Sequence, residues 1–241
     1  MAERRERRSI MGMPVAVLGA DRTAAEAVFA WLREVDARFS TYRRDSEISR
    51  LGRGELALRD AHPDVRAVLA RCDALRVETG GYFDANLKGS DPFGDPSGLV
   101  KGWAVDRAGA LLDAAGLERW CIDAGGDVLL RGGPWRVGIR HPRRRRRLAA
   151  VLELSDAAVA TSGSYERGAH VVDPHSGRTP TGVASVTVVG SRLATADAYA
   201  TAAFAMGMAG PRWTAGLEGY SAMTIAGDRV LTTAGFAAHR R

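Results

Sequence analysis

The chain has 241 residues, of which 46% are apolar and 26% charged, and its formal net charge is +6. This length and balance predict a compact, soluble protein made of one large domain or of two lobes that share a cleft. Much of the positive charge lies in residues 4–8 and in the unbroken run Arg143–Arg147. It is not spread over a face with interleaved aromatic residues, which argues against a nucleic-acid-binding surface.

The N-terminal residues carry no targeting signal. Residues 1–10 are basic and are predicted to be flexible, with the folded domain over 11–241. No apolar segment or lipobox cysteine follows them, and no stretch reaches the roughly 18 apolar residues of a membrane-spanning helix. The expected location is therefore cytoplasmic. Cys72 and Cys121 have no metal-type spacing and are predicted to be buried free thiols.

Three helices are predicted in the first half of the chain, after a strand over residues 10–20. They span 24–40, 63–79 and 98–116. The first has apolar residues at helical spacing, which predicts one buried face. The second and third end at glycines, which favour the left-handed backbone conformation that terminates many helices.

Strands dominate the second half of the chain. Short apolar segments bounded by turn residues predict strands at 120–124, 127–132, 135–140, 148–154, 157–163, 170–174, 184–190, 220–227 and 229–235. The run Arg143–Arg147 falls at the expected tip of a hairpin, as a solvated loop or as a contact for an anionic partner protein or a membrane surface. The alanine-rich segment 194–207 predicts one more helix. The predicted fold class is α+β, with mixed or antiparallel sheets and flanking helices.

Two oxygen-bearing residues of this last helix, Asp197 and Thr201, are four residues apart. Residues at this spacing lie on one face of a helix. A carboxylate and a hydroxyl placed in this way can bind a hard cation such as Mg²⁺, which prefers oxygen ligands and leaves coordination sites for substrate phosphates. Taken alone, Asp197 could also be a helix cap or a partner of the helix dipole.

Several separated motifs occur in a fixed order along the chain. They are FSTYRRDSEISRL at 39–51, GYFDA at 81–85, SGLVKGWAVDRA at 97–108, GGD at 125–127, ATSGSYER at 160–167, HVVDPHSGRTP at 170–180 and ADAYAT at 196–201. Together they resemble the ApbE family of FAD:protein FMN transferases. The resemblance runs from Met11 to Gly207 and implies an ApbE-like single domain of two lobes around an FAD cleft. The loop after Asp84 is shorter than in most of the family, which bears on how the cleft closes.

The resemblance also implies a metal site and a proton acceptor. Mg²⁺ would be bound by Asp197, Thr201 and the backbone carbonyl of Val100. His170 precedes VVDP as the family histidine does, and histidine is well suited to accept a proton near neutral pH. His170 and Asp197 are therefore the expected catalytic residues. Asp173 is expected to cap the turn that follows it.

A second implied set consists of residues that bind FAD. It comprises Met11, Tyr42, Tyr82, Phe83, Asp84, Lys101, Asp106 and Val172. Tyr42 would stack on the isoalloxazine ring, and Lys101 would bring positive charge to the pyrophosphate. The aromatic pair at 82–83 could equally belong to the core, and Asp106 could instead pair with Lys101 or Arg107.

These implications predict a Mg²⁺-dependent FAD:protein FMN transferase. A Thr or Ser hydroxyl of a client flavoprotein would attack the FMN-side phosphorus of FAD, and AMP would leave. With water in place of the client, the protein would be an FAD pyrophosphatase; without turnover, it would be an FAD-binding module. A Rossmann-type dehydrogenase is excluded because DAGGDVLLRGG, around Asp127, lacks the GxGxxG spacing and is followed by a strand.

Overall fold

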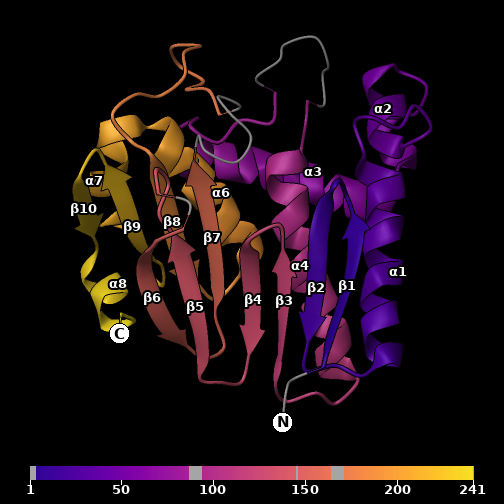
Figure 1. Cartoon of the computed structure of the whole chain (residues 1–241). Coiled ribbons are helices and arrows are strands. Elements are labelled where there is room, and N and C mark those ends of the chain that lie inside the picture. The colour runs from indigo at the N-terminus through magenta and orange to yellow at the C-terminus, as the bar shows by residue number, and fades with distance from the viewer. Residues whose placement is uncertain (1–3, 87–93, 145, 164–170, 241) are drawn as a thin grey trace.

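The computed structural model describes residues 4–86, 94–144, 146–163 and 171–240. Its framework is an eight-stranded antiparallel sheet in the order β1-β2-β3-β4-β7-β8-β9-β10 (Figure 1). The strands are β1 (Arg5–Ile10), β2 (Met13–Leu18), β3 (Trp120–Ala124), β4 (Asp127–Arg131), β7 (Ala158–Gly163), β8 (Ser185–Gly190), β9 (Ser221–Ala226) and β10 (Arg229–Thr232). The spatial order of these strands is their order along the chain, so the other elements are insertions between sheet neighbours.

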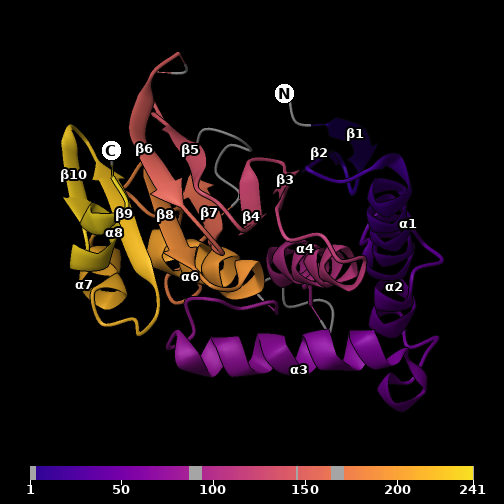
Figure 2. The same ribbon diagram turned by 90° about the horizontal axis from the view of Figure 1, so that it is seen from below.

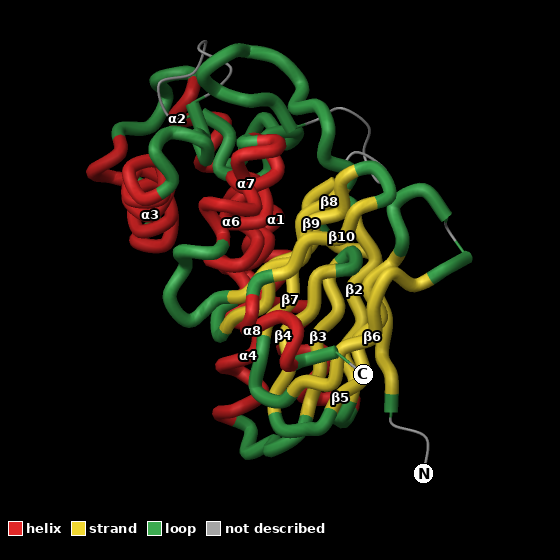
Figure 3. Tube along the Cα trace, turned by 90° about the vertical axis from the view of Figure 1, so that its left-hand side faces the viewer, coloured by secondary structure: helices red, strands yellow, loops and turns green. Residues whose placement is uncertain are grey.

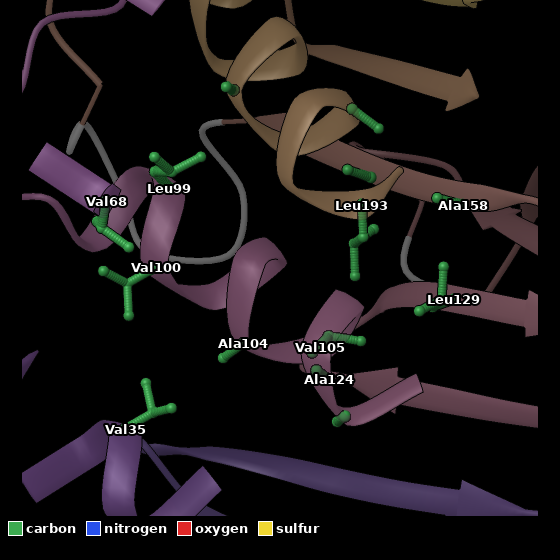
Figure 4. Packing of buried hydrophobic residues seen from close by; sticks show 14 of the residues in the cluster. Val35, Val68, Leu99, Val100, Ala104, Val105, Ala124, Leu129, Ala158 and Leu193 are labelled. Atoms are coloured by element: carbon green, nitrogen blue, oxygen red, sulfur yellow. The ribbon is translucent and has the colours of Figure 1, made fainter. Parts of the chain in front are cut away.

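The long helices cover one face of this sheet (Figure 2). The long ones are α1 (Arg22–Phe39), α3 (Pro63–Glu78), α4 (Ser97–Ala114) and α6 (Leu193–Ala205). The short ones are α2 (Glu47–Gly52), η1 (Leu58–Asp60), η2 (Gly207–Ala209), α7 (Gly210–Thr214) and α8 (Ala234–Ala238). The main core lies between the long helices and the sheet and includes Phe29, Leu32 and Phe204. Figure 4 shows the part of it around α4, where α1, α3, α6 and the sheet meet.

A hairpin covers part of the opposite face. It consists of β5 (Trp135–Arg140) and β6 (Leu148–Leu154), and α8 packs beside it. Trp135, Leu152, Met223 and Phe236 belong to a second core on this side. Strands β8 and β9 are thus covered on both faces, which explains why nearly all of their residues are buried. Figure 3 shows the long helices on one side of the strands and α8 apart from them.

Most of the predicted elements are confirmed. Helices α1, α3 and α4 begin and end within about two residues of the predicted bounds. The run Arg143–Arg147 does connect the two strands of a hairpin, although residue 145 lies outside the described residues. The α+β class with antiparallel sheets and flanking helices is confirmed as well.

The prediction of a flexible N-terminus is wrong for Arg5–Ile10, which form the edge strand β1. The tight turn that joins β1 to β2 makes this pairing possible. Met11 and Gly12 both have positive φ angles, 56° and 70°, and such two-residue turns match the twist of antiparallel strands. The predicted continuous strand over 10–20 is therefore interrupted at this turn, and only Met13–Leu18 form β2.

The predicted strand at 170–174 is also wrong for its described part. Asp173 closes a turn instead: one carboxylate oxygen accepts a hydrogen bond from the His175 amide at 3.0 Å, and the other accepts one from the Ser176 hydroxyl at 2.6 Å. The expected turn-capping role of Asp173 is thereby confirmed. Its backbone forms only an isolated bridge to Arg178.

Cys72 and Cys121 are buried free thiols, as predicted. Burial raises the pKa of each thiol to about 12, and a nearby carboxylate acts in the same direction. No helix in the described ranges is both long and apolar enough to cross a membrane.

Candidate active site

Helices α4 and α6 cross in backbone contact. A β carbon on Gly102 would lie 2.7 Å from the Cα atom of Ala194 and 2.7 Å from the Leu193 carbonyl oxygen, closer than real β carbons approach such atoms. Glycine is therefore required at this crossing because the two backbones leave no room for a side chain. The close contact determines where the first turn of α6 lies relative to α4.

Asp106 strengthens the same crossing. It lies one turn after Gly102, and its two carboxylate oxygens accept hydrogen bonds from the amides of Leu193 at 2.8 Å and Ala194 at 3.0 Å. Burial raises the pKa of Asp106, while these amide hydrogen bonds act against the increase. Asp106 thus caps the N-terminus of α6, and its expected contact with FAD stays a prediction. Asp106 positions the helix that carries Asp197 and Thr201.

Lys101 ion-pairs with two carboxylates that come from different elements. One is Asp127 at the start of β4; the other is Asp197 of α6, whose Oδ2 atom lies 3.4 Å from the Lys101 Nζ atom. Asp127 is 3% exposed and Asp197 is 5% exposed. Burial acts to lower the pKa of the Lys101 ammonium, but the charges of Asp197 and Asp127 outweigh it and hold that pKa above its ordinary value. Lys101 is therefore a permanent cation at physiological pH.

Two hydrogen bonds to β7 complete this part of the site. The Asp127 Oδ1 atom accepts a hydrogen bond from the Thr161 amide at 2.9 Å. The hydroxyls of Ser162 and Thr201 lie 3.1 Å apart and share a hydrogen bond. Lys101, Asp127, Asp197 and Thr201 thus form one group of side chains, called here the α4–α6 cluster, that joins two helices and two strands.

The α4–α6 cluster fits a hard divalent cation in its donor chemistry. Within the described ranges, no three His, Cys, Asp or Glu side chains lie together as a metal-binding group. The donors that α6 offers are one carboxylate and one hydroxyl, Asp197 and Thr201, a turn apart. Two carboxylates also face a single ammonium, an excess of negative charge that a cation would neutralise. Figure 4 shows the Val100 side chain among core residues, so only its backbone carbonyl could be a ligand.

The residues expected to contact the flavin lie in turns and loops. In Figure 1 the β1–β2 turn, which holds Met11, and the loop between α1 and α2, which holds Tyr42, lie at the same end of the sheet. Tyr42 is 98% exposed, and only its backbone amide is held, by the Ser40 hydroxyl at 3.3 Å. A ring so exposed is free to stack on a flat ligand.

The two aromatic residues at 82–83 differ in burial, and their expected contact with FAD stays a prediction. Phe83 is 4% exposed and belongs to the core. Tyr82 is partly buried and packs edge-on against the ring of His175, with 4.5 Å between centroids. Asp84 accepts a hydrogen bond from the Asn86 amide at 2.8 Å, which closes a local turn. Val172 is partly buried. His170 lies outside the described residues, so its predicted role stays a prediction.

Asp127 was not predicted to be a site residue, although it lies in the GGD motif at 125–127. One signal could have revealed it: a carboxylate opens a strand whose next residues, VLL, are apolar. A buried strand that begins with a charged residue needs an ionic partner for that residue. Lys101 is that partner, but nothing in the sequence relates positions 26 residues apart on a helix and a strand.

Comparisons with known proteins show the family of the chain. A profile described as the ApbE family matches residues 11–90 and 94–224. The chain belongs to the ApbE family. An FAD:protein FMN transferase of Vibrio cholerae is 30% identical over 237 residues, which cover 73% of this chain and 71% of that protein. One from Haemophilus influenzae is 25% identical over 249 residues, covering 76% and 72%.

Solved structures of the family share the fold. The flavin transferase ApbE from Vibrio cholerae aligns with a TM-score of 0.85 at 24% identity, covering 98% of this chain and 99% of that one. The ApbE protein of Thermotoga maritima aligns with a TM-score of 0.87 at 22% identity, covering 99% of each chain. These likenesses establish that the ApbE fold extends over nearly the whole chain.

Proposed function

We propose that this protein is a Mg²⁺-dependent FAD:protein FMN transferase that moves FMN from FAD to a Thr or Ser hydroxyl of a client flavoprotein. The observation that carries the proposal is the α4–α6 cluster, in which Asp197 and Thr201 offer oxygens beside the ammonium of Lys101. Family membership supports the reaction type, since the relatives named above are FAD:protein FMN transferases.

Each residue of the cluster has a separate task in this proposal. Asp197, Thr201 and the Val100 carbonyl would hold Mg²⁺, which when bound supplies positive charge that neutralises the pyrophosphate of FAD. The Lys101 ammonium adds a second positive charge, and Asp127 holds that ammonium in place. Because Lys101 stays protonated, it binds phosphate oxygens but does not accept the client's proton.

The transfer step exchanges the phosphoanhydride bond of FAD for a phosphoester bond to the client. The client hydroxyl oxygen attacks the FMN phosphorus in line with the bond to the AMP phosphate, that bond breaks, and AMP leaves. The proton of the hydroxyl passes to His170 or Asp197. Tyr42 stacks on the isoalloxazine ring and holds the FMN half of the substrate.

The test is to incubate the protein with FAD, Mg²⁺ and a client flavoprotein, and to measure the client's intact mass. We expect an increase equal to the FMN moiety, which disappears with EDTA and with a client whose acceptor threonine is alanine. Release of free FMN and AMP without client labelling would show a pyrophosphatase instead. Binding of FAD with neither product would show a binding module.

A further inference from the structure

The outer face of the sheet carries a groove of about 350 Å³ between β5 and strands β1 to β4. Its floor is a face of the main sheet. Arg5, Leu18, Cys121 and Leu130 are successive cross-strand partners and form one row of that floor. Because their side chains all point to the same face, this row is apolar apart from the arginine at its outer end.

The wall of the groove is the edge of β5. All six consecutive residues Trp135–Arg140 line the groove. Successive side chains of a strand point to opposite faces, so a cavity bordered by a face of β5 would be lined by every second residue. A cavity lined by all of them meets the strand edge-on, where backbone amides and carbonyls point outward.

This edge is open in the part of the chain that the structure describes. Strand β5 pairs there with β6 alone. The far edge of β6 is covered by the C-terminal residues, since Leu152 bridges to Arg240 and the Glu153 amide donates to the His239 carbonyl. Figure 2 shows the hairpin standing out from the main sheet, on the side away from the helices. An open strand edge is a template for another extended chain.

One end of the groove reaches the α4–α6 cluster. Asp127 and Thr161 line it, and these are the residues joined by the Thr161 amide hydrogen bond. Asp127 in turn holds Lys101. A chain lying in the groove would therefore run along β5 and arrive beside the residues that are proposed to bind the phosphates.

Resting on the proposed function, we propose that this groove docks an extended, acidic segment of the client protein as an added strand on β5. Backbone hydrogen bonds to the β5 edge would hold the segment, and alternate side chains would point down to the apolar floor and outward to solvent. Its acceptor hydroxyl would then lie near the Asp127 end of the groove.

The charges around the groove select an acidic occupant. Arg5 and Arg136 are exposed at its margin, and the exposed arginines 143, 144, 146 and 147 lie on the connection at the end of the same hairpin. The acidic Asp123 also lines the groove, but its carboxylate accepts the Gly126 amide at 3.0 Å. Positive charge therefore prevails, which favours association with a negatively charged chain.

Two fluorescent synthetic peptides test the proposal with the 241-residue protein. Each contains a single threonine, and valine alternates with glutamate in one and with lysine in the other. We expect fluorescence anisotropy to show binding of the glutamate peptide in preference to the lysine peptide. The variant Arg5→Glu/Arg136→Glu should bind the glutamate peptide about tenfold more weakly and the lysine peptide more tightly. The control Arg212→Glu/Arg229→Glu has the same change in net charge but alters exposed residues of α7 and β10, and it should bind like the wild type.

A backbone probe separates strand addition from charge attraction. Alternate amides of the glutamate peptide are methylated in two registers, so that one peptide loses the donors facing β5 and the other loses those facing solvent. Methylation of the amides that face β5 should abolish binding, whereas methylation of the amides that face solvent should not. Equal binding of both methylated peptides would overturn strand addition.

Other results would overturn docking itself. One such result is equal affinity for the two unmethylated peptides, and another is unchanged peptide binding after the charges of Arg5 and Arg136 are reversed. A loss of FAD affinity in the Arg5→Glu/Arg136→Glu variant would assign the groove to FAD. Concentration-dependent self-association that the variant abolishes would assign it to a second copy of the chain. Charge-selective peptide binding without any FMN transfer would instead contradict the proposed function and leave the docking surface standing.

Discussion

The α4–α6 cluster and the flavin-side turns are built in opposite ways. The side chains of the cluster come from two helices and one strand, and its carboxylates are almost fully buried. The flavin-side residues Met11 and Tyr42 lie in a turn and a loop, and Tyr42 is almost fully exposed. The charged groups that are proposed to hold a phosphate therefore lie on rigid elements, while the ring that is proposed to stack on the flavin lies on a loop.

This difference predicts that changes in the cluster alter turnover, whereas changes in the loops alter binding. The largest effect is expected for Asp197→Asn. An amide binds a cation more weakly than a carboxylate does, so we expect FMN transfer to fall by roughly a thousandfold. The Tm should not fall, because the substitution leaves the Lys101 ammonium paired with one carboxylate, that of Asp127, and removes the excess negative charge of two carboxylates.

Transfer kinetics and thermal unfolding of the same variant check both halves of this prediction. A lower Tm would mean that Asp197 is chiefly a structural residue. A loss of transfer activity with an unchanged Tm would indicate that Asp197 serves the reaction and not the stability of the fold. Unchanged transfer would remove Asp197 from the metal site altogether.

The second effect concerns the crossing of α4 and α6. In Gly102→Ala the new methyl group would meet the backbone of α6 at 2.7 Å, so the helices must move apart. Overpacking of this kind costs about 2 kcal/mol, which corresponds to a fall in Tm of about 4–8 °C for a chain of this size. Because α6 carries Asp197 and Thr201, transfer should also fall at temperatures where the variant is still folded.

Gly216→Ala is the matched control for that experiment. Its nearest heavy atom would be the Trp213 carbonyl oxygen at 3.6 Å, an ordinary contact. We expect its Tm and its transfer rate to match the wild type within error. If Gly102→Ala behaves in the same way, then the position of α6 does not depend on this contact.

How far the sequence predicts these features depends on whether the signal is local. The helical spacing of apolar residues in α1 and the alanine-rich composition of 194–207 are local signals, and both predicted helices that the structure contains. The role of Asp106 was missed because its partners, the amides of Leu193 and Ala194, lie 87 and 88 residues away. Their pairing arises only when α4 and α6 cross at Gly102, and no periodicity in the sequence encodes that crossing.

The strand β1 shows a different limit. Four arginines in residues 4–8 indicated a solvated segment, and most of this strand's side chains are indeed exposed or only partly buried. The segment is ordered because its backbone pairs with β2 over six residue pairs. Charged side chains are compatible with an edge strand, since they discourage further pairing at its open side.

The smallest effect is expected for Tyr42→Ala, in the loop. The ring contacts little of the protein, so the Tm should not change. Loss of stacking on the isoalloxazine ring should weaken FAD binding by about tenfold, measured by titration of flavin fluorescence, with kcat at saturating FAD nearly unchanged. Tyr42→Phe keeps the ring and should bind FAD like the wild type. A fall in kcat with normal FAD affinity would place Tyr42 among the residues that act on the reacting phosphate, and the division of labour between rigid cluster and exposed loop would then be wrong.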